Sequence, residues 1–110
     1  MKSRDRIIEA AIPVFAFKGR HGAHMEEIAT TAKINKAMIY YIFHSKGELY
    51  FEVLKYILEQ AWLSFSPDHH MNLETLDDFK NSLSFYITSQ MAFFTENRDY
   101  TRIIVDAMGN

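Results

Sequence analysis

The stretch NKAMIYYIFHSKGEL, residues 35–49, decides the fold of this chain. It contains seven consecutive apolar or aromatic residues, Ala37 to Phe43, and a lysine lies on each side of that run. The run is far shorter than the roughly 20 residues that a transmembrane helix needs. A helix that carries it cannot bury all of these side chains in one core. We therefore expect part of the run to meet something other than water.

Capping signals on both sides predict a short helix here. Asn35 is a good N-cap residue, and Ile34 and Ile39 have the spacing of a hydrophobic staple around it. Ser45 and Glu48 then form a capping box that starts the next helix at Lys46. The helix between them must end around Phe43, so it is only two turns long.

The two sides of this short helix have different chemistry. At about 100° per residue, Ile39 and Phe43 share one side, and the staple commits that side to the core. Five residues form or border the opposite side: Lys36, Ala37, Met38, Tyr40 and Tyr41. A short helix that exposes such residues next to a turn is typical of a recognition helix in a helix-turn-helix unit. An exposed tyrosine pair taken alone is more often a packing edge or a protein contact.

Helical periodicity predicts the rest of the chain, with no strand pattern and no internal repeat. We expect a helix from Ser3, as N-cap, to Gly19, with a bend at Pro13. The stretch SPDHHMN, residues 66–72, reads as a loop. The other helices are expected over residues 25–32, 46–65 and 75–95, with a last one from Tyr100. The predicted fold is all-α: a three-helix bundle with a helix-turn-helix, then a long fourth helix and the start of a helical C-terminal domain.

Charge divides the chain into two halves of opposite sign. Residues 1–50 hold eight Lys or Arg and five Asp or Glu, a net +3, whereas residues 51–110 hold four and nine, a net −5. A positive head on an acidic body suits a polyanionic partner that binds at one end. Ordinary surface scatter explains the same numbers equally well.

Several classes of protein are disfavoured. The chain has no cysteine, which excludes zinc fingers and disulfide frameworks, and its N-terminus has no secretory signal, so we expect a cytoplasmic protein without a membrane anchor. His21 and His24 lack the carboxylate cluster that would complete a metal site. The sequence contains neither a phosphate-binding loop nor a dinucleotide fingerprint. We expect no enzyme activity, no cofactor and no metal.

The outward side chains of the short helix carry groups that can contact the bases and phosphates of DNA. Lys36 can donate to guanine or to a phosphate, and Met38 offers apolar contact to a thymine methyl group. Tyr40 and Tyr41 can each give a hydroxyl to a phosphate. Lys46 begins the next helix, where backbone N–H groups and the dipole already favour an anion.

The segment GAHMEEIATTAKINKAMIYYIFHSKGEL, residues 22–49, preceded by IIEAAIPVFAFKG, residues 7–19, resembles the DNA-binding domain of the TetR family of bacterial transcriptional repressors. The match runs from about Ile7 to Val53. It implies a DNA-binding domain over residues 1–48 and a partial effector-binding and dimerisation domain over residues 49–110. It also implies a homodimer on a palindromic double-stranded operator, released by a small-molecule effector. The DNA contacts that it implies are His24, Asn35, Lys36, Ala37, Met38, Tyr40, Tyr41 and Lys46.

Four positions depart from the family's usual pattern. Lys33 stands at the common turn glycine and would be strained if that position needs a positive φ. Ile42 replaces a frequent phosphate-binding histidine, so one anchor is expected to be lost. Ala37 and Met38 replace a frequent Gly and Thr or Ser, which should shift base preference.

The second half of the chain is less informative. Its aromatic residues are mostly expected in the core, although four of them could line an effector pocket: Trp62, Phe65, Tyr86 and Phe94. Surplus apolar residues on residues 75–95 indicate a missing neighbour, so we expect a truncated or partial regulator. The alternative is a protein-interaction module that pairs with a full-length relative through its last three helices.

Overall fold

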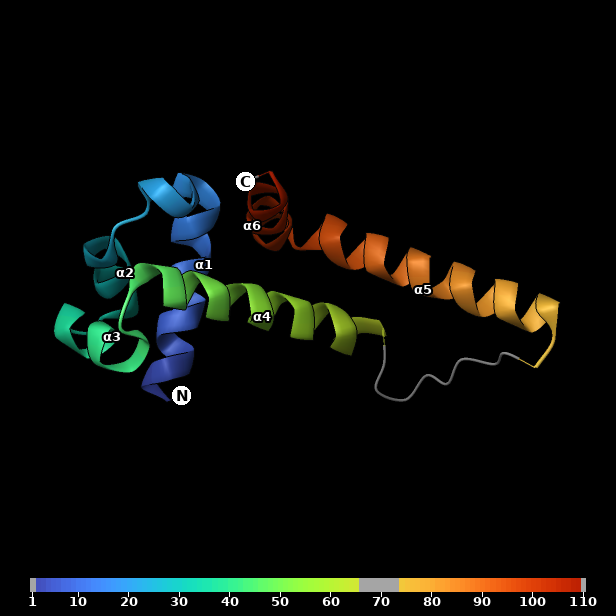
Figure 1. Ribbon diagram of the computed structural model, residues 1–110, viewed down its shortest axis with the longest axis horizontal. Helices are drawn as coiled ribbons and strands as arrows, with labels where there is room; N and C mark the ends of the chain where they lie inside the picture. The colour runs from blue at the N-terminus through green and yellow to red at the C-terminus, as the bar shows by residue number, and fades with distance from the viewer. Residues whose placement is uncertain (1, 66–73, 110) are drawn as a thin grey trace.

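The computed structural model describes residues 2–65 and 74–109, and within these ranges helices are the only regular secondary structure, as predicted (Figure 1). The expected loop over residues 66–72 lies outside the described residues. The helices are α1 (Ser3–Gly22), α2 (Met25–Ala32), α3 (Lys36–Phe43), α4 (Lys46–Phe65), α5 (Leu76–Glu96) and α6 (Arg98–Met108).

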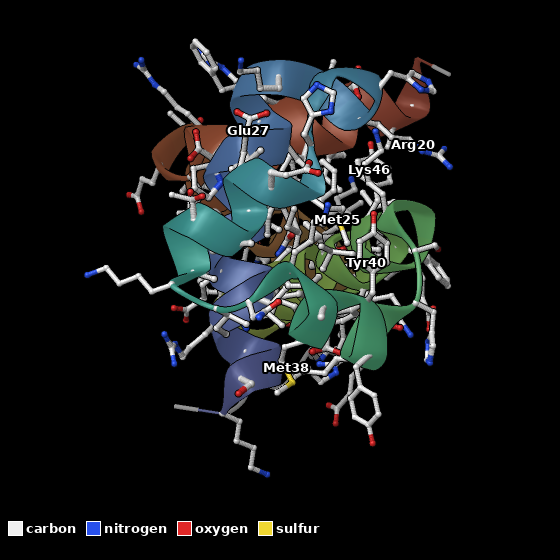
Figure 2. The ribbon with its side chains drawn as sticks, turned by 90° about the vertical axis from the view of Figure 1, so that its left-hand side faces the viewer. Arg20, Met25, Glu27, Met38, Tyr40 and Lys46 are labelled. Atoms are coloured by element: carbon white, nitrogen blue, oxygen red, sulfur yellow. The ribbon has the colours of Figure 1, made fainter. Side chains whose placement is uncertain are left out.

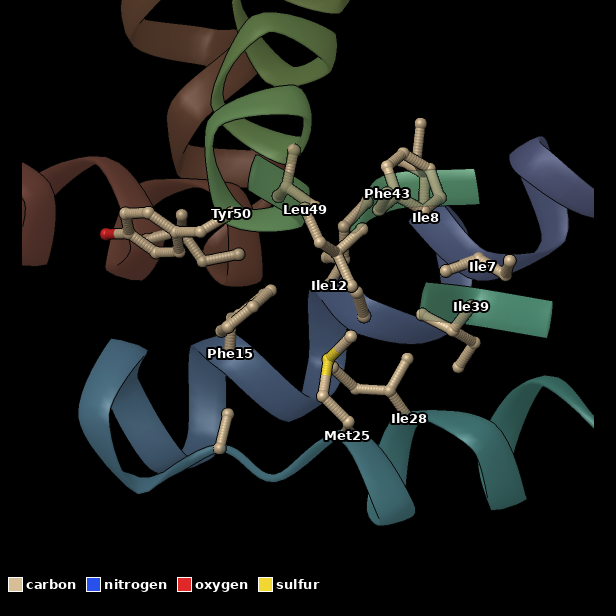
Figure 3. Close-up of a cluster of buried hydrophobic side chains, with 14 of the residues drawn as sticks. Ile7, Ile8, Ile12, Phe15, Met25, Ile28, Ile39, Phe43, Leu49 and Tyr50 are labelled. Carbon is tan, nitrogen blue, oxygen red and sulfur yellow. The ribbon is translucent and has the colours of Figure 1, made fainter. Parts of the chain in front are cut away.

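The first three helices and the start of α4 enclose one apolar core (Figure 3). Each contributes the residues that recur at helical spacing, for example Ile28 of α2, Ile39 of α3 and Leu49 of α4, all fully buried. Phe15 of α1 packs edge-on against Tyr50 of α4, with 5.1 Å between ring centroids. This core fixes α3 at one end of the molecule.

Helix α1 differs from the prediction at its N-terminus and at its proline. Lys2 is the N-cap and Ser3 already lies in the first turn. The backbone dihedrals stay helical at Pro13 and leave the helical region only at Gly19, with φ 76° and ψ 171°. Pro13 is exposed, so water can hydrate the carbonyl that lacks its N–H partner. The break at Gly19 confirms the predicted stop, and a short helical turn follows it.

The helices α4 and α5 extend together away from this core, and α6 returns to pack beside α1 (Figure 1). Aromatic contacts join α4 to α5; the ring centroids of Phe65 and Tyr86, for example, are 4.8 Å apart. Gln90 Nε2 of α5 also donates a hydrogen bond to the carbonyl of Ala61 in α4. Ile103 of α6 is buried against the core of the bundle. Helices α2 and α3 lie at the end of the molecule opposite the pair α4 and α5 (Figure 1).

The apolar stripe predicted on α4 is only partly buried. Leu58 and Trp62 belong to that stripe, yet their side chains are exposed, because α5 covers the neighbouring side that holds Ala61 and Phe65. Helix α6 begins at Arg98, two residues before the predicted start. Of the described helices, none combines the length and apolar character needed to cross a bilayer.

Candidate nucleic-acid interface

A tight turn joins α2 to α3. Lys33 adopts a left-handed conformation, with φ 57° and ψ 44°, at the position where the sequence raised the question of a positive φ. The N–H of Ile34 donates to the carbonyl of Ala29 at 3.1 Å, which closes the end of α2. A left-handed lysine carries a strain that glycine would not, so this turn is held by its surroundings.

Arg6 of α1 supplies part of that support. Its Nη2 donates to the carbonyl oxygens of Ala32 at 2.7 Å and Lys33 at 3.4 Å, which satisfies carbonyls that the end of α2 leaves free. This residue was not identified from the sequence. No sequence pattern near Arg6 indicates that its side chain contacts Ala32, which lies 26 residues further along the chain.

Helix α3 is fixed at its start and along its inner side, as predicted. The Asn35 side chain caps it by accepting from the N–H of Ala37 at 2.8 Å. Ile39 and Phe43 are buried in the core that α3 shares with α1, α2 and α4, and Ile34 packs against the same core. These contacts set the rotation of α3 and therefore decide which residues face outward.

The outward side of α3 is open to solvent. Tyr41 is 80% exposed, Met38 44% and Tyr40 42%, and Lys36 and Ala37 are also exposed. Figure 2 looks onto the end of the molecule that holds α2 and α3, with the α4–α5 arm behind it. In the described residues nothing covers this face, so a DNA duplex can approach it.

Lys36 is paired with a neighbour on α2. Its Nζ lies 2.7 Å from Oε1 of Glu26, and both side chains are largely exposed. The hydrogen bond from Lys36 lowers the pKa of Glu26, and the same bond raises the pKa of Lys36. Lys36, which was expected to donate to guanine or to a phosphate, thus already donates to a carboxylate within the protein.

The ammonium of Lys46 also makes hydrogen bonds within the protein. Its Nζ donates to the backbone carbonyls of Ala23 at 3.0 Å and His21 at 3.3 Å, so the ammonium joins the start of α4 to the last turn of α1 and the loop that follows it. The predicted capping of α4 is half present: the N–H of Glu48 donates to Ser45 Oγ at 3.0 Å. The Glu48 carboxylate contacts His44 Nδ1 at 3.1 Å instead of returning to the cap.

Three further positions lie near this interface: His24, Ile42 and His44. His24 occupies the N-cap of α2, but its side chain makes no capping hydrogen bond, and the imidazole is exposed. His44 has a φ of 67° between α3 and α4, a strained turn that no motif predicted. Ile42, in place of the family's frequent histidine, is partly buried against the core.

The four residues of the possible effector pocket do not share one hollow. Trp62, Phe65 and Tyr86 form a chain of ring contacts, although Trp62 is 61% exposed. Phe94 packs edge-on against Phe93 and lines a separate, open hollow of about 600 Å³ at the α5–α6 junction. The described residues therefore place one expected member apart from the other three.

Helix α3 is short and exposed on one side, its residues Ile39 and Phe43 are buried on the other, and a tight turn joins it to α2. This arrangement defines a helix-turn-helix unit. Residues 7–53 match the family model described as bacterial regulatory proteins, tetR family. The match covers 47 of the 110 residues, and it confirms the resemblance of this segment to the tetR family that its sequence indicated.

Curated relatives match over this first half. The HTH-type transcriptional repressor NicS of Pseudomonas putida is 46% identical over 56 residues, which are 51% of this chain and 26% of that protein. The HTH-type transcriptional regulator RutR of Escherichia coli is 41% identical over 61 residues, 56% of this chain and 28% of that protein. The chain therefore spans about a quarter of the length of these relatives.

One solved structure matches nearly the whole fold. A TetR-like transcriptional regulator from Rhodococcus sp. RHA1 superimposes with a TM-score of 0.71 and covers 92% of this chain and 53% of its own. The sequences are 22% identical, so this likeness concerns the fold alone.

Proposed function

We propose that the chain is a sequence-specific DNA-binding transcriptional regulator, most simply a repressor, that places α3 in the major groove. The observation that carries the proposal is the exposed outward side of α3, where a methionine and two tyrosines remain in solvent although apolar burial would favour covering them. Relatives named as transcriptional repressors support it.

The proposed contacts are the eight residues expected from the sequence, with two roles adjusted to the contacts described above. Lys36 acts together with Glu26, so its contribution depends on that pair. Lys46 positions the loop before α2 through its side chain and offers the start of α4 to a phosphate through backbone N–H groups. The contact residues are His24, Asn35, Lys36, Ala37, Met38, Tyr40, Tyr41 and Lys46.

In this proposal residues 1–48 form the DNA-binding domain and residues 49–110 belong to the effector-binding and dimerisation domain. A two-fold dimer would hold two copies of α3 about 34–36 Å apart to meet one face of B-DNA at a palindromic operator. A small-molecule effector would release the operator by changing that separation through α4 and α6, which both contact α1.

The proposal is tested by selecting bound duplexes from a random pool and measuring affinity for the selected sequence by fluorescence anisotropy. Tyr41→Ala is expected to weaken binding about tenfold. Phe17→Ala removes an equally exposed aromatic ring from α1 and is expected to leave affinity unchanged. Failure to select any sequence, or equal affinities for wild type and Tyr41→Ala, would contradict the proposal.

A second candidate is favoured by the surface of α5. Several of its large apolar side chains are exposed, including Leu76, Phe79 and Met91, which is typical of a helix that packs on another chain. In that case the protein pairs with a longer relative through α4 to α6. Light scattering of the chain mixed with such a relative separates the candidates, because only pairing yields a complex of summed mass.

A further inference from the structure

The side chain of Arg6 connects α1 to the turn between α2 and α3. Its Nη2 donates to the carbonyl oxygen of Ala32 at 2.7 Å and to that of Lys33 at 3.4 Å. Arg6 is partly buried, and the next residue, Ile7, is fully buried in the core. The ion pairs within 4.0 Å in the described ranges involve other cations. The guanidinium therefore serves the turn, and it does so from a helix that the core holds in place.

The end of α2 needs a donor that its own residues do not supply. The N–H groups of Lys33 and Ile34 return to carbonyls of α2 at 3.2 Å and 3.1 Å, the paired hydrogen bonds of a Schellman motif. Neither bond involves the carbonyl of Ala32, and the last turn of α2 contains no basic residue. Arg6 supplies the donor from α1, and its charge faces the negative end of the α2 dipole.

This turn sets the direction in which α3 leaves α2. Lys33 has φ 57° and ψ 44°, and Asn35 caps α3 only two residues later. A lysine is strained in the left-handed region, so its dihedrals stay there only where the surroundings oppose a change. Ile39 and Phe43 anchor the middle and the end of α3 in the core, whereas the hydrogen bonds of Arg6 hold the turn at its start.

We propose that Arg6 is a positioning residue for DNA recognition, which holds the turn at Lys33 and thereby keeps the start of α3 in the orientation that meets the major groove. The inference rests on the proposed DNA-binding function. Arg6 acts through main-chain oxygens of the turn and contacts neither a base nor a phosphate. Its loss therefore weakens binding to the correct sequence more than binding to DNA in general, because the sequence-independent part depends on cations that remain in place.

A charge-matched pair of variants tests this role. Arg6→Met removes every donor and keeps an unbranched side chain, and Arg98→Met makes the same change at an exposed arginine that begins α6. Fluorescence anisotropy over a range of salt concentrations gives the affinities for the selected duplex and for an unrelated duplex of equal length. We expect Arg6→Met to bind the selected duplex about tenfold more weakly and the unrelated duplex within about twofold of wild type, with an unchanged salt slope. Arg98→Met is expected to match wild type in all three quantities.

Two further measurements separate positioning from charge. Arg6→Lys keeps the charge without the planar guanidinium, so it is expected to restore only part of the affinity for the selected duplex. Hydrogen exchange, followed by NMR in the absence of DNA, reports on the turn directly. The amide of Ile34 is expected to exchange about tenfold faster in Arg6→Met, with a much smaller change at Ile57, which is buried in α4.

Three results would overturn this role of Arg6 and leave the DNA-binding function standing. A salt slope reduced by about one in Arg6→Met would mean that the guanidinium neutralises a phosphate directly. Equal proportional losses on both duplexes would mean only that less of the protein is folded. Wild-type affinity together with wild-type exchange at Ile34 would mean that the turn holds without Arg6. If wild type itself prefers no duplex, the DNA-binding function fails and this role fails with it.

Discussion

The ammonium of Lys36 and the carboxylate of Glu26 lie 2.7 Å apart at the N-terminal end of the exposed α3 face. Their hydrogen bond lowers the pKa of Glu26 and raises that of Lys36, so both groups are charged at neutral pH. The proposed DNA interface therefore carries a fixed negative charge next to its main cation. We therefore expect Glu26 to weaken the contact that Lys36 makes with DNA.

Replacing Glu26→Gln is expected to tighten DNA binding about 3- to 10-fold at low salt. The change removes a charge that repels phosphates and frees Lys36, so the salt dependence should steepen by about one unit of slope. Anisotropy titrations over a range of salt concentrations measure both quantities. Glu59→Gln, at an exposed position on α4, serves as the control. Weaker binding by Glu26→Gln would show instead that its carboxylate contacts a base directly, as cytosine permits.

Lys46→Gln is expected to lower the free energy of unfolding by about 1–2 kcal/mol, because two backbone carbonyls lose a charged donor. Its salt slope for DNA binding should equal that of wild type, since the ammonium is already engaged within the protein. Urea denaturation and salt titration give the two numbers. Unchanged stability with a slope reduced by about one would mean that Lys46 neutralises a phosphate directly.

Lys33→Gly is expected to raise the free energy of unfolding by about 0.5–1 kcal/mol. Glycine adopts the left-handed conformation of this turn without the strain that a lysine has there. Lys55→Gly places the same substitution at an exposed position in α4 and should lower stability by about 1 kcal/mol. Two losses of similar size in urea denaturation would contradict the account of the turn.

Stability should fall at alkaline pH through Tyr100. Burial, with neighbouring Tyr56 adding to it, raises the pKa of Tyr100 to about 12. An unfolded tyrosine loses its proton near pH 10, so the unfolded state binds fewer protons between the two values, and stability decreases as pH rises through that window. Unfolding at pH 9 and pH 11 should show a smaller drop for Tyr100→Phe than for wild type.

Tyr41→Phe is the matched control for this pH dependence, because it removes a hydroxyl from an exposed ring on α3. It is expected to show the same drop between pH 9 and pH 11 as wild type. A drop in Tyr100→Phe that equals the wild-type value would contradict the assignment.

Local spacing explains why α3 could be predicted closely. The cap at Asn35 and the buried pair Ile39 and Phe43 depend on residues within one or two helical turns, and these interactions determine both the ends and the rotation of the helix. Helix starts were predicted less exactly. Lys2, not Ser3, is the N-cap of α1, and α6 begins at Arg98, two residues before Tyr100, because neighbouring residues compete as caps.

Long-range contacts could not be predicted in the same way. Arg6 and Lys46 donate to carbonyls that lie more than 20 residues away in the sequence, and the sequence gives no pattern for such pairs. The exposure of Trp62 likewise depends on which side of α4 is covered by α5, which periodicity alone leaves open.

A cross-linking measurement tests the proposed docking of α3 most directly. The chain has no cysteine, so a single substitution gives a unique thiol. Ala37→Cys, at the exposed side of α3, and Phe51→Cys, at an exposed position on α4, are each mixed with a selected duplex that carries a disulfide tether on the major-groove edge of a cytosine. We predict rapid disulfide formation with Ala37→Cys and none with Phe51→Cys. Retained DNA binding without a cross-link from Ala37→Cys, or equal cross-linking by both variants, would contradict the placement of α3 in the major groove.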